Sequence, residues 1–351
     1  MPVETRSLIL RSCAALAALA AASLPVQAQE KVVKVGIAKA LATAATMIAI
    51  EKGYFKEAGI KVEIEDLDSS ANVMSLLAQG QLQIVEGGIS VGYFNALERG
   101  LPIAIVADRV STPLSHKLLV RADLADQIKT PGDLKGKNIA SNGPGAVTTY
   151  EVAKILAKDK VSIKDVDIKV LSFVNMGIAL TNKAVDAALV IQPWASQYVE
   201  QGIAKVFADP DDYADPKPLT IAVNLLNTDW ADKNKDLVRA YFTAYQKAVY
   251  EYCQAYHGGK NRQEVIDILV KTGLETRPDV LQRYPWPARN PNGHISDASL
   301  LDMQKYYLSE GLATKENPLA KLVDYQYVDY ATQKLGPFKL ENTASKLAGC
   351  Q

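Results

Sequence analysis

Strand and helix patterns alternate along the first part of the chain, and this alternation restricts the fold more than any other feature. After Lys31, short apolar runs are separated by stretches with helical spacing. The strand patterns lie at 31–38, 60–67, 82–88 and 102–109, and the helix patterns lie at 43–59, 70–81 and 91–100. Strands that alternate with helices form a mostly parallel sheet with helices on both faces. The sequence therefore predicts an α/β fold.

The same order of elements then starts again near residue 137. Strand patterns lie at 137–142, 166–173 and 186–192, with helix patterns at 146–159 and 175–185 between them. At an offset of 103 positions, Asn72 meets Asn175, Leu77 meets Leu180 and Gln83 meets Asp186. Self-similarity at a fixed offset indicates a repeat, so we predict two similar α/β lobes. The alternative is that any two βαβ units resemble one another at this level.

The last third of the chain is mainly helical. A strand pattern at 218–226 returns from the second lobe, and helix patterns follow at 236–256, 261–273 and 299–311. The first of these helices carries an aromatic stripe at helical spacing, formed by Tyr241, Phe242, Tyr245, Val249, Tyr252 and Tyr256. Such a stripe is typical of core packing, so we expect it to pack against the first lobe and not to bind a ligand.

The first 28 residues have the organisation of a signal peptide. Arg6 and Arg11 precede an apolar run that is too short to cross a bilayer, and a small-residue site follows, which predicts cleavage after Ala28. A short membrane anchor is the alternative. Cleavage removes two of the 39 basic residues and one of the 39 acidic residues, leaving 37 and 38. This balance excludes a nucleic-acid binder, which needs a basic surface.

Two cysteines remain after cleavage, Cys253 and Cys350. An oxidising compartment permits a disulfide between them. The alternative is one buried thiol and one thiol in the C-terminal tail.

The stretch ASNGPGAVTTYEVAKIL (140–156) combines a strand end, a glycine-rich turn and the start of a helix. Helix N-termini carry unpaired N–H groups that attract anions. Lys154 is too far along for a phosphate-binding Walker loop, and Thr148 stands where a dinucleotide fingerprint needs its third glycine. We therefore expect no cofactor. The turn suits a carboxylate or sulfonate, although a plain strand–helix turn with satisfied caps would look the same.

Other candidate groups follow the strands, where open α/β sheets bind ligands. Trp194 could stack on a solute or pack between the lobes. Arg109 ends a strand and could bind an anion or pair with Asp108 or another surface acid. His116, His257 and His294 have no metal-binding spacing and are expected at the surface. The sequence also carries none of the common hydrolase or metalloprotease motifs, so we expect neither an enzyme nor a metal site.

Three stretches of the chain resemble the nitrate/sulfonate/taurine-type periplasmic substrate-binding proteins of ABC importers. They are MIAIEKGYFKEAGIKVEIEDLDSSANVMSLLAQGQLQI, GGISVGYFNALERGLPIAIVAD and TPGDLKGKNIASNGPGAVTTYEVAKIL. That group also includes proteins that bind pyrimidine precursors. The resemblance runs from about Lys31 to the segment VDYQYVDYATQKLG (323–336), which is nearly the whole mature chain.

This resemblance implies a two-lobed type II periplasmic binding protein fold, in which each lobe is a mostly parallel sheet flanked by helices and two crossing strands form a hinge. Lobe 1 would comprise residues 29–112 and 224–351, and lobe 2 residues 113–223. The hinge would fall near 111–113 and 220–224. The solute would lie between the lobes, and closure would create the surface that docks on the permease.

Carried over by position, the resemblance assigns solute binding to residues in the loops that follow the strands. These are Lys39, Ala40, Thr43, Ala44, Gly87, Gly88, Ser90, Asn142, Gly145, Ala146, Thr148, Thr149, Asn175, Met176, Gln192 and Trp194. Met176 and Trp194 would supply apolar wall. Sulfonate and nitrate binders often place a charged group in the cleft, and these loops offer no unambiguous one. The alanine-rich loop 38–45 favours a less polar or larger solute.

The expected function is therefore that of a periplasmic, monomeric receptor that delivers a small anionic organic solute to the transmembrane subunits of an ABC permease. Three alternatives stay open: a pyrimidine-precursor binder, a related biosynthetic enzyme that uses a histidine and a lysine-bound cofactor, and a receptor that serves a sensor.

Overall fold

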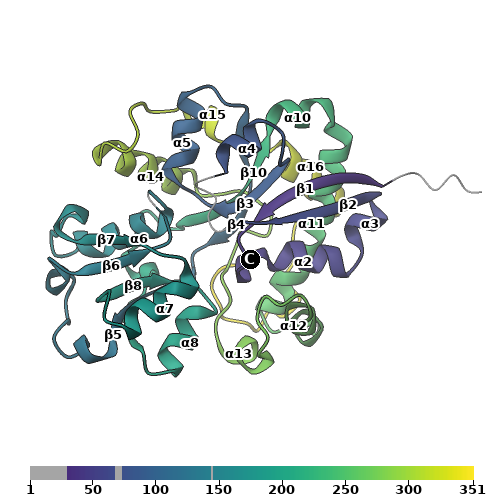
Figure 1. Cartoon of the computed structure of the whole chain (residues 1–351). Helices are drawn as coiled ribbons and strands as arrows, with labels where there is room; N and C mark the ends of the chain where they lie inside the picture. Colours follow the sequence, from purple (N-terminus) through teal and green to yellow (C-terminus); the bar gives the residue numbers. More distant parts are fainter. Residues whose placement is uncertain (1–29, 68–72, 144) are drawn as a thin grey trace, which may run out of the picture.

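The computed structural model describes residues 30–67, 73–143 and 145–351. The predicted signal peptide (1–28), Asn72 of the repeat and Pro144 of the glycine-rich turn lie outside the described residues. Two five-stranded sheets, each with its own helices, form two lobes that lie side by side (Figure 1).

The first sheet has the order β2-β1-β3-β10-β4. Its strands are β1 (Lys31–Ile37), β2 (Ile60–Asp66), β3 (Ile84–Gly88), β4 (Ile103–Ser111) and β10 (Thr220–Asn227). The pairs β1–β2 and β1–β3 are parallel, whereas β10 runs antiparallel to both of its neighbours. A strand from late in the chain therefore separates β3 from β4. This strand, β10, corresponds to the returning strand predicted at 218–226.

The second sheet repeats this order as β7-β6-β8-β5-β9. Its strands are β5 (Lys117–Arg121), β6 (Asn138–Ser141), β7 (Asp167–Val170), β8 (Ala187–Val190) and β9 (Ala204–Ala208). Here β5 is the antiparallel strand between β8 and β9. The strands β5 and β9 were not predicted, because these short strands do not belong to the βαβ alternation. The equal strand order supports the repeat.

Helices cover both sheets. Around the first sheet lie α2 (Ala44–Glu51), α3 (Tyr54–Glu57), α4 (Met74–Ala78) and α5 (Val91–Glu98); around the second lie α6 (Val147–Ala157), α7 (Phe173–Thr181), α8 (Trp194–Glu200) and α9 (Pro210–Tyr213). Short 3₁₀ turns span Leu41–Thr43, Ala122–Leu124, Pro131–Leu134 and Ile163–Asp165. The single helix predicted over 43–59 is divided at Gly53, whose φ of 75° ends α2.

The helical last third packs mainly on the first lobe (Figure 1). It comprises α10 (Thr228–Lys233), α11 (Lys235–Tyr256), α12 (Arg262–Lys271), α13 (Pro278–Arg283), α14 (Asp297–Ser309), α15 (Leu319–Leu322) and α16 (Gln326–Leu335). All six residues of the predicted aromatic stripe on α11 are buried in one core with β1 and α2. The expectation that they form core is confirmed.

Two segments join the lobes, and they run next to each other. The main chain of Thr112 donates to the carbonyl of Leu219 at 2.9 Å. The hydroxyls of Ser111 and Thr220 are 2.7 Å apart. Both segments lie where the hinge was expected. β10 pairs with the first sheet along its whole length, including residues 220–223, which the predicted boundary assigns to lobe 2. The exact boundaries between the lobes, at 112/113 and 223/224, stay a prediction.

The C-terminal tail returns to the end of α11. Cys253 and Cys350 form a disulfide with a Cα–Cα distance of 5.1 Å. This result decides between the two states of the cysteines that the sequence left open.

The two lobes also touch across the space between them. The main chain of Val91 donates to the carbonyl of Gly145 at 2.9 Å, and Ser90 forms a bridge with Ala146. Farther along α6, the hydroxyl of Tyr150 donates to Asp302 on α14 at 2.6 Å. Ser90 and Ala146, which form the bridge, also line the cavity described next.

Candidate functional site

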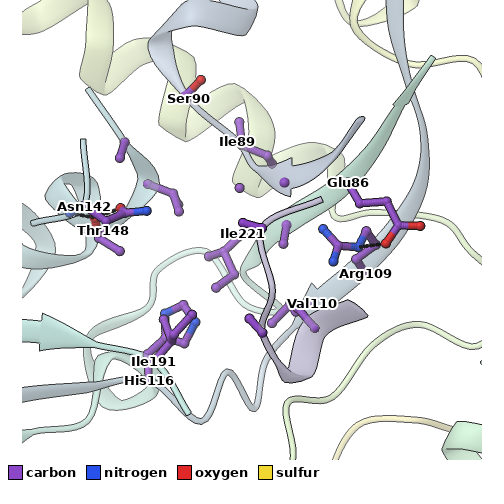
Figure 2. A pocket seen from close by; sticks show the side chains of 18 of the residues that line it. Glu86, Ile89, Ser90, Arg109, Val110, His116, Asn142, Thr148, Ile191 and Ile221 are labelled. Atoms are coloured by element: carbon purple, nitrogen blue, oxygen red, sulfur yellow. Dashed lines mark hydrogen bonds and ion pairs between the residues drawn. The ribbon is translucent and has the colours of Figure 1, made fainter. Parts of the chain in front are cut away.

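A cavity lies between the lobes, at the ends of the strands that face the partner lobe (Figure 2). It contains about 660 Å³ of empty space, part of which opens to solvent. The first lobe contributes the loop after β1, the end of β3, the end of β4 and the start of β10. The second lobe contributes His116, the turn before α6, the start of α7 and the residue after β8.

Seven of the predicted site residues line this cavity: Ala40, Gly87, Gly88, Ser90, Asn142, Ala146 and Thr148. They come from three separate loops, which the fold brings together because the strand ends of the two sheets face each other. That these residues bind a solute stays a prediction.

The other nine predicted residues do not line the cavity. Gln192 lines a small neighbouring cavity. Thr43, Ala44 and Met176 are buried, Asn175 is exposed, and Lys39 pairs with Asp66 at 2.9 Å on the surface. The hydroxyl of Thr149 forms a hydrogen bond of 2.8 Å with the hydroxyl of Ser141. Gly145 instead forms the contact between the lobes, and Trp194 begins α8, where it stacks on Phe173.

The aromatic wall of the cavity is therefore Phe173 rather than Trp194. The two rings are stacked with centroids 5.7 Å apart, so Trp194 packs against Phe173 without lining the cavity itself. Of the two roles predicted for Trp194, stacking on a solute or packing within the protein, its contact with Phe173 fits packing. Phe173 itself was predicted as the last residue of a strand, so its place in the wall could not be read from the pattern. The rest of the wall is mainly apolar, with Val110, Val147, Ile191 and Ile221 among its residues.

Arg109 and Glu86 form a buried ion pair in the wall of the cavity. The Nε atom of Arg109 lies 3.4 Å from Oε2 of Glu86, and both side chains are nearly inaccessible. Thr46 donates to the other carboxylate oxygen of Glu86. Burial raises the pKa of Glu86, while the positive charge of Arg109 lowers it. The pairing of Arg109 with Asp108 or a surface acid, considered above, is replaced by this internal pair.

Both members of this pair keep atoms without a hydrogen bond. Nε and Nη2 of Arg109 and Oε2 of Glu86 are buried and have no hydrogen-bond partner among the described residues, although Nε and Oε2 face each other in the ion pair. The guanidinium points toward the middle of the cavity, and the carboxyl of Glu86 lies behind it (Figure 2). A buried, incompletely bonded guanidinium is costly unless an acceptor completes its hydrogen bonds. The sequence offered a signal for this pair, since each charge interrupts an apolar strand.

His116 faces the same cavity from the second lobe. Its Nδ1 atom lies 3.0 and 3.1 Å from the two carboxylate oxygens of Glu151, which is buried on α6. The expectation that the histidines lie at the surface is wrong for His116 and for His257, which are both buried; His294 is the one that is substantially exposed. The local sequence could not show this, because the hydrogen-bond partners of the two buried histidines, Glu151 for His116 and Ser345 for His257, lie at least 35 positions away.

Ser90 and Asn142 supply further polar atoms. The hydroxyl of Ser90 is buried and has no hydrogen-bond partner in the described part of the chain. The side-chain oxygen of Asn142 accepts from the hydroxyl of Thr148 at 2.7 Å (Figure 2). Thr148 also contacts Ser141 at 2.7 Å, so its hydroxyl is largely occupied within the protein. Beside the Arg109–Glu86 pair, the cavity thus offers the hydroxyl of Ser90 and the side-chain amide of Asn142 as polar groups.

Metal chemistry finds no support in these side chains. Within residues 30–67, 73–143 and 145–351, no group of three or more His, Cys, Asp or Glu could hold a metal ion. The helices in these ranges are also all too short or too polar to cross a membrane.

Solved structures share the fold. The alkanesulfonate-binding protein SsuA from Xanthomonas axonopodis pv. citri, bound to MOPS, is 20% identical with a TM-score of 0.70, and the match covers 85% of this chain and 99% of that chain. The periplasmic nitrate-binding protein NrtA from Synechocystis PCC 6803 is 17% identical with a TM-score of 0.68, covering 87% and 89%. These similarities establish the two-lobed fold of periplasmic binding proteins.

One structural neighbour is named as an enzyme. The desulfurization enzyme DSZB is 12% identical with a TM-score of 0.60, and the match covers 86% of this chain and 99% of that chain. The curated protein sequences contain no match. A family model described as NMT1/THI5 like matches residues 42–256, which is more than half of the chain. The chain therefore belongs to the NMT1/THI5-like family and has the type II periplasmic binding protein fold.

Proposed function

We propose that this protein is the solute-binding component of an ABC importer, exported to the periplasm by residues 1–28, and that it captures a small acidic organic solute in the cavity between its lobes. The observation that carries the proposal is Arg109, a buried guanidinium that points into the cavity and whose Nε and Nη2 atoms have no hydrogen-bond partner among the described residues. The family and the fold of the structural neighbours support the same reading.

The solute would bind by contacts with both lobes. Arg109 and Ser90 would donate from the first lobe, while Asn142 donates from the second lobe. Phe173 and the aliphatic residues would cover the apolar part of the solute. Since only contacts made in the closed arrangement stabilise closure, a solute that bridges the lobes would favour the form that docks on the permease.

The enzyme alternative has little support in the cavity. Pyridoxal phosphate is held through a lysine, and no lysine occurs among the described residues that line the cavity. Lys39, the nearest candidate in sequence, is exposed and paired with Asp66. The residues do not fit this cofactor, and we derive no reaction from it.

A thermal-shift panel tests the proposal. Residues 29–351, refolded to remove carried ligand, would be mixed with nitrate, alkyl and aryl sulfonates, aliphatic and aromatic carboxylates, and pyrimidines. At a hundredfold excess over Kd, a ligand adds about 2.7 kcal/mol of stability, which amounts to several degrees. A shift with one class of acid supports the proposal; a shift with pyrimidines alone would favour the pyrimidine-precursor alternative.

The double variant E86Q/R109Q tests the assigned residue. It removes both charges together and so leaves neither one buried alone. We expect Kd for the acid found in the panel to rise about tenfold or more, from the loss of hydrogen bonds to a charged group. Titration calorimetry measures this change, with unfolding experiments to show that the variant folds. Unchanged affinity would remove Arg109 from the site.

A further inference from the structure

His116 has one ring nitrogen committed to the protein and one that is not. A carboxylate can only accept hydrogen bonds, so the contacts of Nδ1 with Glu151 at 3.0 and 3.1 Å require that Nδ1 carries the proton. Among the described residues Nε2 has no hydrogen-bond partner, and the ring lines the cavity. The atom available to a solute is therefore Nε2.

The state of Nε2 depends on the charge of the ring. When the ring is neutral, Glu151 fixes the proton on Nδ1 and leaves Nε2 with a bare lone pair, which repels an acceptor. When the ring is protonated, Nε2 carries a hydrogen and donates. The buried carboxylate of Glu151 compensates the positive charge of that form.

The two lobes therefore present corresponding groups to the cavity. The first lobe presents a cationic donor, Arg109, with the buried carboxylate of Glu86 behind it. On the second lobe, His116 is placed in the same way in front of Glu151. Asp211 on α9 is a further acid near His116, and its carboxylate accepts from the main chain of Leu114 at 2.9 Å.

We infer that His116, in its protonated form, is the second lobe's contact for the acidic group of the solute, and that Glu151 is its positioning residue. The inference rests on the proposed function. An acid held by Arg109 on one lobe and His116 on the other would link the lobes directly. It follows that closure depends on the charge of the imidazole, and that acids bind more weakly as pH rises.

The test uses two matched pairs of probes: butanesulfonate with butanesulfonamide, and benzoate with benzamide. Each pair has one acid and one neutral counterpart of similar size. Kd would be measured by titration calorimetry at pH 6, 7 and 8 for the wild type, H116Q and E151Q. H294Q is the control, because it makes the same change at an exposed histidine that does not line the cavity.

For the wild type we expect an acid to bind better than its amide, and to bind about tenfold more weakly at pH 8 than at pH 6. H116Q should weaken acid binding at pH 6 about tenfold and remove the pH dependence. E151Q should reduce the preference for the acid over the amide. H294Q and D211N should both keep the pH dependence of acid binding. D211N in particular tests whether Asp211, and not His116, causes that pH dependence.

Acid binding that is independent of pH in the wild type would overturn the inference, as would an H116Q variant that binds and responds to pH like the wild type. Binding of amides alone would also overturn it. In each of these cases the protein remains a solute receptor. If none of the four probes binds to folded wild-type protein, the inference fails, and the proposed acid specificity fails with it. Circular dichroism and thermal unfolding would establish that each variant is folded.

Discussion

Several charged residues near the hinge are fully buried, and Asp108 shows how single positions are held. Its carboxylate accepts from the main chain of Asn290 at 2.5 Å and from the hydroxyl of Ser111 at 2.9 Å. Burial raises the pKa of Asp108 to about 7, against the lowering effect of these hydrogen bonds. Because Ser111 also contacts Thr220, this carboxyl group belongs to a polar chain that connects the two segments joining the lobes.

The raised pKa of Asp108 should make the stability of the folded protein depend on pH. An unfolded aspartate titrates near pH 3.9, so between about pH 4 and about pH 7 the unfolded state loses its proton while the folded state keeps it, and stability falls as pH rises. D108N imitates the protonated form. Relative to the wild type, it should gain roughly 2–4 kcal/mol between pH 4 and pH 7. Urea unfolding at both pH values measures this difference.

Comparison with D211N makes the experiment specific. Burial also raises the pKa of Asp211, to about 6, so D211N should show a smaller gain with the same sign. A difference between D108N and the wild type that does not vary with pH would mean that Asp108 is ionised in the folded protein.

At the scale of elements, α11 and the C-terminal tail act as one unit. The disulfide joins residues that are 97 positions apart. Tail contacts surround it: the hydroxyl of Tyr256 donates to the carbonyl of Ala348 at 2.8 Å, and Nε2 of His257 lies 3.0 Å from the carbonyl of Gly349. Gly349 also lies against Pro113, where the chain leaves the first lobe. The tail therefore braces α11 and one of the joining segments together.

Removal of the disulfide should destabilise the first lobe. C350S opens a long loop, and the expected loss is about 2–4 kcal/mol in the free energy of unfolding. Urea unfolding with and without a reducing agent measures it. The reducing agent should lower the stability of the wild type to that of C350S and leave C350S unchanged. A wild type that is indifferent to reduction would show that the disulfide contributes nothing.

At the scale of the whole molecule, a few contacts join the two lobes, both beside the cavity and away from it. Glu200 on α8 pairs with Arg277 and Arg283 at 3.1 Å and accepts from Tyr284 at 2.6 Å. Near the cavity the contact is closer, because Gly145 packs directly on the first lobe. Its φ of 63° favours glycine, and a Cβ at this position would lie 2.3 Å from Cγ1 of Val91.

We therefore expect G145A to oppose closure. A methyl group should hold the lobes apart and raise Kd for the solute found in the panel about tenfold, since a left-handed alanine and the collision each cost about 1 kcal/mol or more. Titration calorimetry gives the affinity, and small-angle scattering with saturating solute should show a more open molecule. V91A removes Cγ1, so G145A/V91A should recover part of the affinity. No recovery would mean that the collision with Cγ1 of Val91 does not cause the loss of affinity.

The sequence by itself determined the fold class and the main elements of its βαβ alternation. The strands of the βαβ alternation, the aromatic face of α11 and the helix ends at Gly273 and Gly311 follow from local periodicity and from backbone conformations that glycine tolerates. It also selected most of the loops at the cavity, because ligands bind beyond the carboxyl ends of strands in open α/β sheets. These features depend on residues that are close together along the chain, so they can be predicted from the sequence alone.

Only the tertiary structure decided which polar side chains meet in the cavity. Glu86 and Arg109 come together because β10 inserts between β3 and β4 from more than a hundred positions away. His116 is buried because a short antiparallel strand, missed in the sequence, places it against Glu151 on α6. Whether a charge is buried, and which opposite charge accompanies it, depends on contacts between distant segments. A local pattern can mark a charge inside an apolar strand, as at Glu86 and Arg109, but it does not identify the distant residue that accompanies that charge. The chemistry of the candidate site depends on those distant contacts.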